Sequence, residues 1–242
     1  MLHTLRGVVL HHIRYKESSA IVYIYTDLFG RQAYLANSTR GKKAKFRSNL
    51  LQPLSLLEIE AYHMERSELQ RLKEIRNYIP YQSILVDPFK SSQAMFIAEI
   101  LYKVLREEDP NPGLYEFLEH SLQFLDVAEE HTVNFHLLFL VQLTRYLGFY
   151  PDSQYGDSNY LFDMRNGQFK EAISQHPDFF DESSSTVLNT LLEANFESLK
   201  SVKINHEERV RFLDFLMDFY SLHVGGFGKV RSLAVLNEIF RS

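Results

Sequence analysis

A short basic stretch near the N-terminus is the part of this sequence best suited to binding chemistry. Five cations lie within eight residues: Arg40, Lys42, Lys43, Lys45 and Arg47. No Asp or Glu occurs between Asp27 and Glu58, so no acid within the stretch balances these charges. Lysine and arginine bind phosphate backbones without reading base sequence, because neutralised phosphates release their condensed counterions. The stretch therefore indicates a polyanion as ligand, most simply a nucleic acid.

The net charge of the chain is distributed unevenly. Residues 1–50 hold nine Lys/Arg and two acids, a balance of +7, whereas the remainder holds 17 Lys/Arg and 29 acids, a balance of −12. This asymmetry predicts a basic module that faces a polyanion and an acidic module with another partner. Two alternatives remain open at this point: the basic stretch is a solvated loop, or it binds an acidic protein surface.

Other residues in the basic half can add nucleic-acid contacts. Aromatic rings stack on bases of any identity and contribute about 1–3 kcal/mol per base. The candidates besides the five clustered cations are Arg14, Lys16, Arg31, Tyr34 and Phe46. Tyr23 and Tyr25 share one face of a strand pattern, and we expect them to pack against the protein instead.

Several well-known catalytic and metal-binding signatures are absent from the sequence. The chain has no cysteine, which excludes disulfides, thiolate zinc sites and thiol catalysis. It contains neither His-Glu-x-x-His nor Gly-x-Ser-x-Gly. Gly228-Lys229 resembles the end of a P-loop, but His223 replaces the first glycine and Val230 replaces the Ser/Thr. We expect no enzymatic activity, no metal and no cofactor.

Five short strands are predicted in the first 80 residues. They span residues 7–13, 20–27, 31–36, 54–62 and 69–78, and the last of them also fits a helix. Five strands in so short a stretch suggest a small closed barrel, for which the OB-fold is the five-stranded candidate.

Helical periodicity replaces the strand pattern after residue 80. Asp87-Pro88 predicts a helix start, and further helices are expected at about 114–125, 133–147, 185–194, 206–220 and 232–240. A polar, turn-rich insert at about 149–170 holds possible short strands at 159–164 and 168–170. The predicted fold class is thus α+β, with a barrel over residues 1–80 and an all-α helical domain over 81–242. No apolar run is long enough for a signal peptide or a membrane helix, so we expect a cytoplasmic protein.

The order of several segments makes the chain resemble the RecO family of bacterial recombination mediators and DNA repair proteins. In the first half these segments are residues 7–10, 15–19, 25–27, 30–31, 40–43 and 50–54. In the second half they are residues 147–151 (Leu-Gly-Phe-Tyr-Pro), 162–167 (Phe-Asp-Met-Arg-Asn-Gly) and 223–233.

The resemblance implies an OB-fold followed by a helical domain, which agrees with the strand and helix patterns. It also implies a nucleoid-associated protein that binds single- and double-stranded DNA and anneals complementary strands. With RecR, such a protein helps to load RecA onto single strands covered by SSB.

Two functional details do not transfer directly from the family. Many relatives carry a four-cysteine zinc module after the Leu-Gly-x-x-Pro segment, and this chain has no cysteine there. We expect no zinc, with the insert held by its own packing, for example through Tyr155, Tyr160, Leu161 and Phe162. The acidic SSB tail is expected to bind the helical domain, at a site for which Arg145, Lys229 and Arg231 are the candidate cations.

Overall fold

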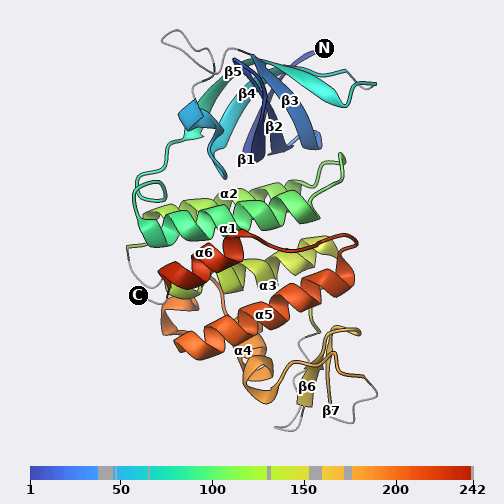
Figure 1. Cartoon of the computed structure of the whole chain (residues 1–242), viewed down its shortest axis with the longest axis vertical. Helices are drawn as coiled ribbons and strands as arrows, with labels where there is room; N and C mark the ends of the chain where they lie inside the picture. Colours follow the sequence, from blue (N-terminus) through green and yellow to red (C-terminus); the bar gives the residue numbers. More distant parts are fainter. Residues whose placement is uncertain are drawn as a thin grey trace. The chain divides into compact units, whose positions relative to one another are not determined.

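The computed structural model describes residues 1–37, 46, 48–64, 66–129, 132–152, 160–171 and 176–240. The chain divides into two compact units, Met1–Val127 and Ala128–Ser242. The first unit consists of a barrel and two helices, and the second of helices and a small two-stranded sheet (Figure 1). The domain boundary predicted near residue 80 lies beside Ile79, the last residue of the barrel, whereas the first compact unit continues through two further helices.

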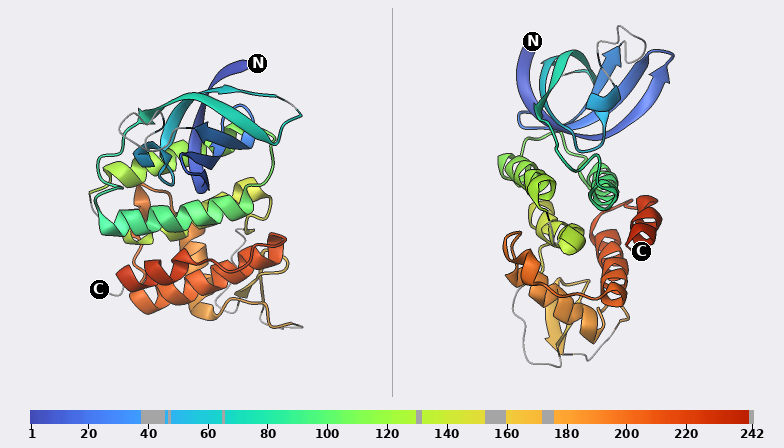
Figure 2. Two further views of the ribbon diagram at one scale, coloured as in Figure 1. Left: turned by 45° about the horizontal axis from the view of Figure 1, so that its top comes forward. Right: turned by 90° about the vertical axis from the view of Figure 1, so that its left-hand side faces the viewer.

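The N-terminal sheet is a closed barrel with the strand order β1-β2-β3-β5-β4, seen from two further sides in Figure 2. Its strands are β1 (Leu2–Lys16), β2 (Ser19–Thr26), β3 (Gly30–Asn37), β4 (Leu56–Tyr62) and β5 (Leu69–Ile79). Neighbouring strands are antiparallel except β3 and β5, which pair in parallel from Ala33–Leu69 to Leu35–Arg71. The predicted five-stranded OB-fold is confirmed, and the ambiguous segment 69–78 is a strand.

Alternation of side chains builds the barrel core. Val22, Ile24 and Tyr34 point inward and are fully buried, whereas Ile21, Tyr23, Ala33 and Leu35, which lie directly beside them in the chain, are partly exposed. Gly7 lies inside the barrel where β1 packs closely on β2, because a Cβ there would be 2.4 Å from Ile24 Cγ2. β1 is longer than the predicted segment 7–13, since its first residues pair with β4, from Leu2–Tyr62 onward.

Two helices complete the first unit, α1 (Pro88–Val104) and α2 (Pro112–Val127). The predicted start at Asp87-Pro88 is confirmed: the Asp87 carboxylate accepts from the backbone N–H of Phe89 at 2.8 Å and of Lys90 at 3.1 Å. This N-cap satisfies donors that have no partner within the helix.

A buried carboxylate fixes the connection between the barrel and α1. Asp126, in the last turn of α2, accepts from the backbone N–H groups of Gln82, Ser83 and Ile84 at 2.8–3.0 Å. The buried Lys90 ammonium donates to Ser83 Oγ at 2.6 Å and to the Asp126 carbonyl at 2.9 Å. Burial alone would raise the pKa of Asp126, but the three N–H donors and Lys90 outweigh it and hold the pKa below its usual value.

The second unit contains α3 (Phe135–Leu147), α4 (Glu182–Glu193), α5 (His206–His223) and α6 (Ser232–Ile239), with strands β6 (Tyr160–Asp163) and β7 (Gln168–Glu171). Gly148 ends α3 in the left-handed conformation at φ 82°, and Asn205 with Glu208 forms the capping box of α5. In the described residues, no helix is long and apolar enough to cross a membrane.

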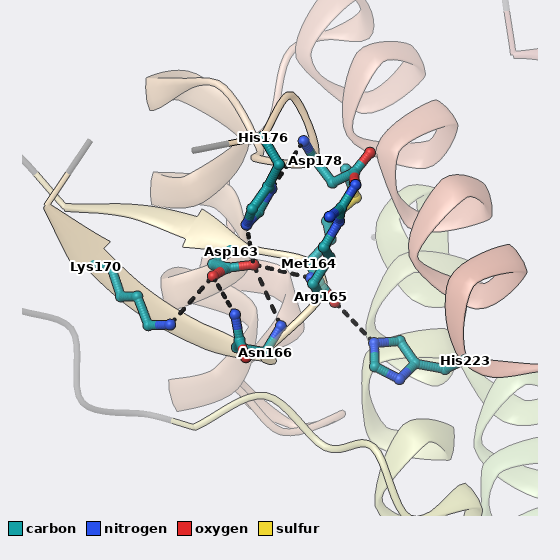
Figure 3. A network of polar contacts seen from close by, with 8 residues as sticks. All are labelled: Asp163, Met164, Arg165, Asn166, Lys170, His176, Asp178 and His223. Carbon is teal, nitrogen blue, oxygen red and sulfur yellow. Dashed lines mark hydrogen bonds and ion pairs between the residues drawn. The ribbon is translucent and has the colours of Figure 1, made fainter. Parts of the chain in front are cut away.

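A buried carboxylate also organises the insert around β6 and β7 (Figure 3). Asp163 accepts from the Arg165 N–H at 2.9 Å, from Asn166 Nδ2 at 2.6 Å and from Lys170 Nζ at 3.2 Å. His223 of α5 donates from Nε2 to the Met164 carbonyl at 2.7 Å, which ties the hairpin to that helix. Of the residues expected to hold this insert, Phe162 is fully buried, and Tyr160 and Leu161 are partly exposed, while Tyr155 lies outside the described residues.

We predict that Asp163→Ala loosens this hairpin and destabilises the second unit by about 1–3 kcal/mol, because it removes the buried acceptor that the donors of Arg165, Asn166 and Lys170 share. Hydrogen exchange of the β6 and β7 amides in the full chain measures the effect. Asp178→Ala is the control, since its carboxylate pairs with the exposed Arg165 and should matter less. Equal protection in both variants would contradict the central role of Asp163.

The pKa of Asp163 predicts how the β6–β7 hairpin responds to low pH. Burial favours a higher pKa for Asp163, but the donors from Asn166, Lys170 and Arg165 hold the pKa below its usual value. A carboxylate with a lowered folded-state pKa stabilises the fold fully above its unfolded pKa, about 3.9. The contribution is lost as the pH falls through the lower folded value, so amide protection of β6 and β7 should decline only below about pH 4.

Candidate nucleic-acid interface

The register of β1, β2 and β3 brings separate basic segments to one end of the barrel. Lys16 pairs with Ser19, and Ser19 pairs with Asn37, the last residue of β3. A hydrogen bond of 3.1 Å from Ser19 Oγ to Asn37 Oδ1 ties the two strand ends together. The chain enters the basic stretch directly after Asn37. The β1–β2 hairpin therefore lies beside Asn37, the last described residue before that stretch.

Arg14 and Lys16 are the cations that β1 contributes to this end. Every residue of β1 from His11 to Lys16 is exposed, because the strand has left β4 and pairs only with β2 there. Tyr15 is 50% exposed, and the Lys16 ammonium lies 5.4 Å from the centre of its ring. An exposed ring beside two exposed cations can contact both a base and phosphates.

The clustered cations Arg40, Lys42, Lys43, Lys45 and Arg47 lie outside the described residues. Their place in the candidate interface rests on the sequence and on the position of Asn37 at the end of β3.

Arg31 has a different environment from the one expected of a DNA contact. Its Nη1 donates to the carbonyl of Tyr102 at 3.0 Å and to that of Leu105 at 2.9 Å, which are at the C-terminal end of α1. The guanidinium also lies 4.5 Å from the ring centre of Tyr102 and 5.0 Å from that of Tyr23. These contacts join the barrel to α1, so Arg31 is removed from the candidate interface.

The prediction that Tyr34 and Phe46 contact nucleic acid is also wrong. Tyr34 has no exposed surface and Phe46 has 2%, and both belong to the barrel core. A base cannot stack on a ring that the protein encloses on both faces. Burial raises the pKa of Tyr34 far above its usual value, in keeping with a hydroxyl removed from water. The alternation of β3 carries the signal for Tyr34, since Gln32 and Ala36 share its buried face.

Arg71 is a further cation of the barrel, and the sequence pattern does not single it out. It is exposed on β5 and pairs with Leu35 of β3, two residues before Asn37. The ambiguity of segment 69–78 hid it, because a helix and a strand would place this side chain on different faces.

The candidate cations of the second unit are all exposed. Arg145 is in the last turn of α3, and its guanidinium lies 4.4 Å from the ring centre of Tyr150. Lys229 and Arg231 are on the segment between α5 and α6, next to Gly228, whose φ is 62°. Arg145 thus reaches solvent while resting on an aromatic ring. Among the described residues, no group of three or more His, Asp or Glu is arranged to hold a metal ion.

Comparison with known proteins covers both units. The family model "Recombination protein O N terminal" matches residues 1–78, and "Recombination protein O C terminal" matches residues 85–234. The chain is 39% identical over 240 residues to a DNA repair protein RecO of Phocaeicola vulgatus, with 99% of this chain and 100% of that protein covered. It is 39% identical over 241 residues to one of Bacteroides fragilis, with 99% and 100% covered. A third, of Christiangramia forsetii, is 38% identical over 242 residues, with 99% of each covered.

Proposed function

The chain belongs to the RecO family of DNA repair proteins, and from this membership we propose that it is a recombination mediator that binds DNA through its barrel. The observation that supports the proposal is the strand register that brings Arg14 and Lys16 beside Asn37, where the basic stretch begins. A barrel end with many cations neutralises phosphates and requires no base-specific group. The interface should therefore bind both single- and double-stranded DNA without sequence preference.

Annealing of complementary strands follows from the same chemistry. Two single strands repel each other through their phosphates, and cations that neutralise both strands lower this barrier. We propose that the barrel anneals strands in this way, and that with RecR the protein helps to load RecA onto strands covered by SSB. These activities require binding and exchange of partners rather than bond chemistry, so we propose a protein that is not an enzyme.

The basic stretch provides the direct test of DNA binding. Replacing Arg40, Lys42, Lys43 and Lys45 by Ala should weaken binding to a single strand about tenfold to a hundredfold. If the unmodified chain neutralises about four phosphates, its log–log salt slope should be near −3, and the slope should move toward zero in the variant.

A charge-matched pair of variants controls for nonspecific electrostatics. Lys42→Ala with Lys43→Ala changes the net charge by the same amount as Lys200→Ala with Lys203→Ala, two exposed positions of the second unit. The first pair should weaken binding and the second should not. A chain that binds no DNA even at low salt would instead support the alternative, a protein adaptor whose basic stretch binds an acidic partner.

We propose further that the second unit receives the acidic tail of SSB, with Arg145, Lys229 and Arg231 as candidate cations. The support is that all three are exposed and that Arg145 rests on Tyr150, which offers a cation and an apolar surface together. Arg145→Ala should reduce the affinity for the tail peptide about threefold to tenfold, measured by titration with the full chain. Unaltered affinity would place the tail elsewhere.

A further inference from the structure

A continuous row of paired residues circles the barrel through all five strands. Successive pairs link Ile13 to Ile21, Ile21 to Leu35, Leu35 to Arg71, Arg71 to Tyr62 and Tyr62 to Leu2. We call these six residues the outer row. Neighbouring strands lie about 4.8 Å apart, so consecutive members of the row are side-chain neighbours.

The outer row points away from the barrel core. Each of three members has a buried neighbour in the chain that points inward. Val22 follows Ile21 on β2, Leu72 follows Arg71 on β5, and Tyr34 precedes Leu35 on β3. By alternation, Ile21, Arg71 and Leu35 point outward. Ile13 is 40% exposed, Tyr62 47% and Leu2 43%, while Ile21 and Leu35 are partly exposed.

An outward row of this composition is unusual for a sheet that faces water, where polar side chains are expected. The rest of the outer face of β4 and β5 follows the expectation, since Glu58 pairs with Arg76 and Glu60 pairs with Lys73. In the next row toward α1 the side chains are not purely apolar and contact that helix: the ring centre of Tyr102 lies 4.7 Å from that of His11 and 5.1 Å from that of Tyr23. The outer row combines exposure with apolar character, and neither neighbouring region does so.

Cations border this apolar surface. Arg71 is a member of the row, Arg14 and Lys16 follow Ile13 on β1, and Asn37, where the basic stretch begins, follows Leu35 on β3. Apolar side chains between cations match the chemistry of a single strand of nucleic acid, whose bases are apolar on their faces and whose phosphates are anionic. In a duplex the bases are stacked on one another, and only phosphates and groove edges are available.

We propose that the outer row is the surface on which bases of single-stranded DNA pack, with Ile13, Leu35 and Tyr62 as the base contacts and Arg71 as a phosphate contact. This inference rests on the proposed DNA-binding function and adds that two parts of the barrel surface bind different forms of DNA. The cations hold either form of DNA, whereas the outer row holds only the single strand.

The test substitutes apolar members of the row with threonine, which is polar but favours strands. The full chain with Ile13→Thr and Leu35→Thr should bind an oligothymidylate about tenfold more weakly and bind a duplex of equal length as before. Because apolar contacts release no counterions, the log–log salt slope for the oligothymidylate should stay the same in this variant. Leu28→Thr, in the β2–β3 turn and outside the row, is the matched control.

Each result has a distinct meaning. Selective loss of single-strand binding at an unchanged salt slope supports the outer row. Equal loss for both forms of DNA, or no loss in a folded variant, overturns it. If the unmodified chain binds neither form of DNA, it is the proposed function itself that fails.

Discussion

Replacing Asp126 by alanine is expected to destabilise the first unit by about 3–5 kcal/mol, the largest effect predicted for a single side chain here. The substitution removes the acceptor for three backbone N–H groups, those of Gln82, Ser83 and Ile84. It also takes the neighbouring carboxylate away from Lys90, whose side chain is buried. Unpaired buried donors and an uncompensated buried charge are each costly, and here they would occur together.

Urea unfolding of the full chain, followed by hydrogen exchange of residues 82–84, measures this effect. Asp126→Asn keeps one acceptor oxygen but loses the charge, so it should fall between the unmodified chain and Asp126→Ala. Glu129→Ala, three residues further on and exposed, removes one negative charge as a control and should change stability by less than about 0.5 kcal/mol. Similar stability of the Asp126 and Glu129 variants would show that this carboxylate does not anchor the connection.

Gly30→Ala is expected to destabilise the first unit by about 3 kcal/mol, for two reasons that can be separated. Gly30 has φ 57°, where a residue with a Cβ costs about 1–2 kcal/mol. A Cβ there would also lie 2.5 Å from the Asp109 carbonyl oxygen and 2.9 Å from that of Glu107. These are backbone atoms of the segment after α1, to which the Arg31 N–H donates at 3.0 Å, so the clash must displace the joint between barrel and helix.

Gly148 is the matched control for the cost of placing a Cβ in the left-handed backbone conformation. Its φ is 82°, but a Cβ there would meet nothing within 4 Å. Gly148→Ala should therefore cost only the conformational part, about 1–2 kcal/mol. The difference between the two variants, read from unfolding of the full chain, isolates the clash. Equal losses would indicate that the segment after α1 moves aside without cost.

Local patterns in the sequence predicted most of the secondary structure. The alternation of β2, the Asp87-Pro88 start of α1, Gly148 after α3 and the Asn205 capping box all act through residues a few positions apart. Short-range geometry and hydrogen bonding decide these features, so the sequence contains their cause directly. Local patterns did not predict the full length of β1, because its first residues form a strand only by pairing with β4.

The roles of Arg31, Tyr34 and Phe46 show the limit of reasoning from composition. A basic or aromatic residue within a basic half is a reasonable candidate for contact with nucleic acid. However, its availability depends on which atoms of distant segments surround it. Arg31 meets carbonyls more than 70 residues away, and the two rings are enclosed by the closure of the barrel.

The sequence alone thus determined that this protein has a basic strand-rich half, an acidic helical half and the order of segments typical of RecO, because charge and periodicity are properties of the chain itself. Only the tertiary structure decided which cations remain accessible, that buried Asp126 and Asp163 hold the connection and the insert, and that six residues from five strands form one outer row. The physical reason is that strand register and burial result from pairing between segments far apart in the chain. Moving one strand by a single residue would turn its part of the outer row into the core.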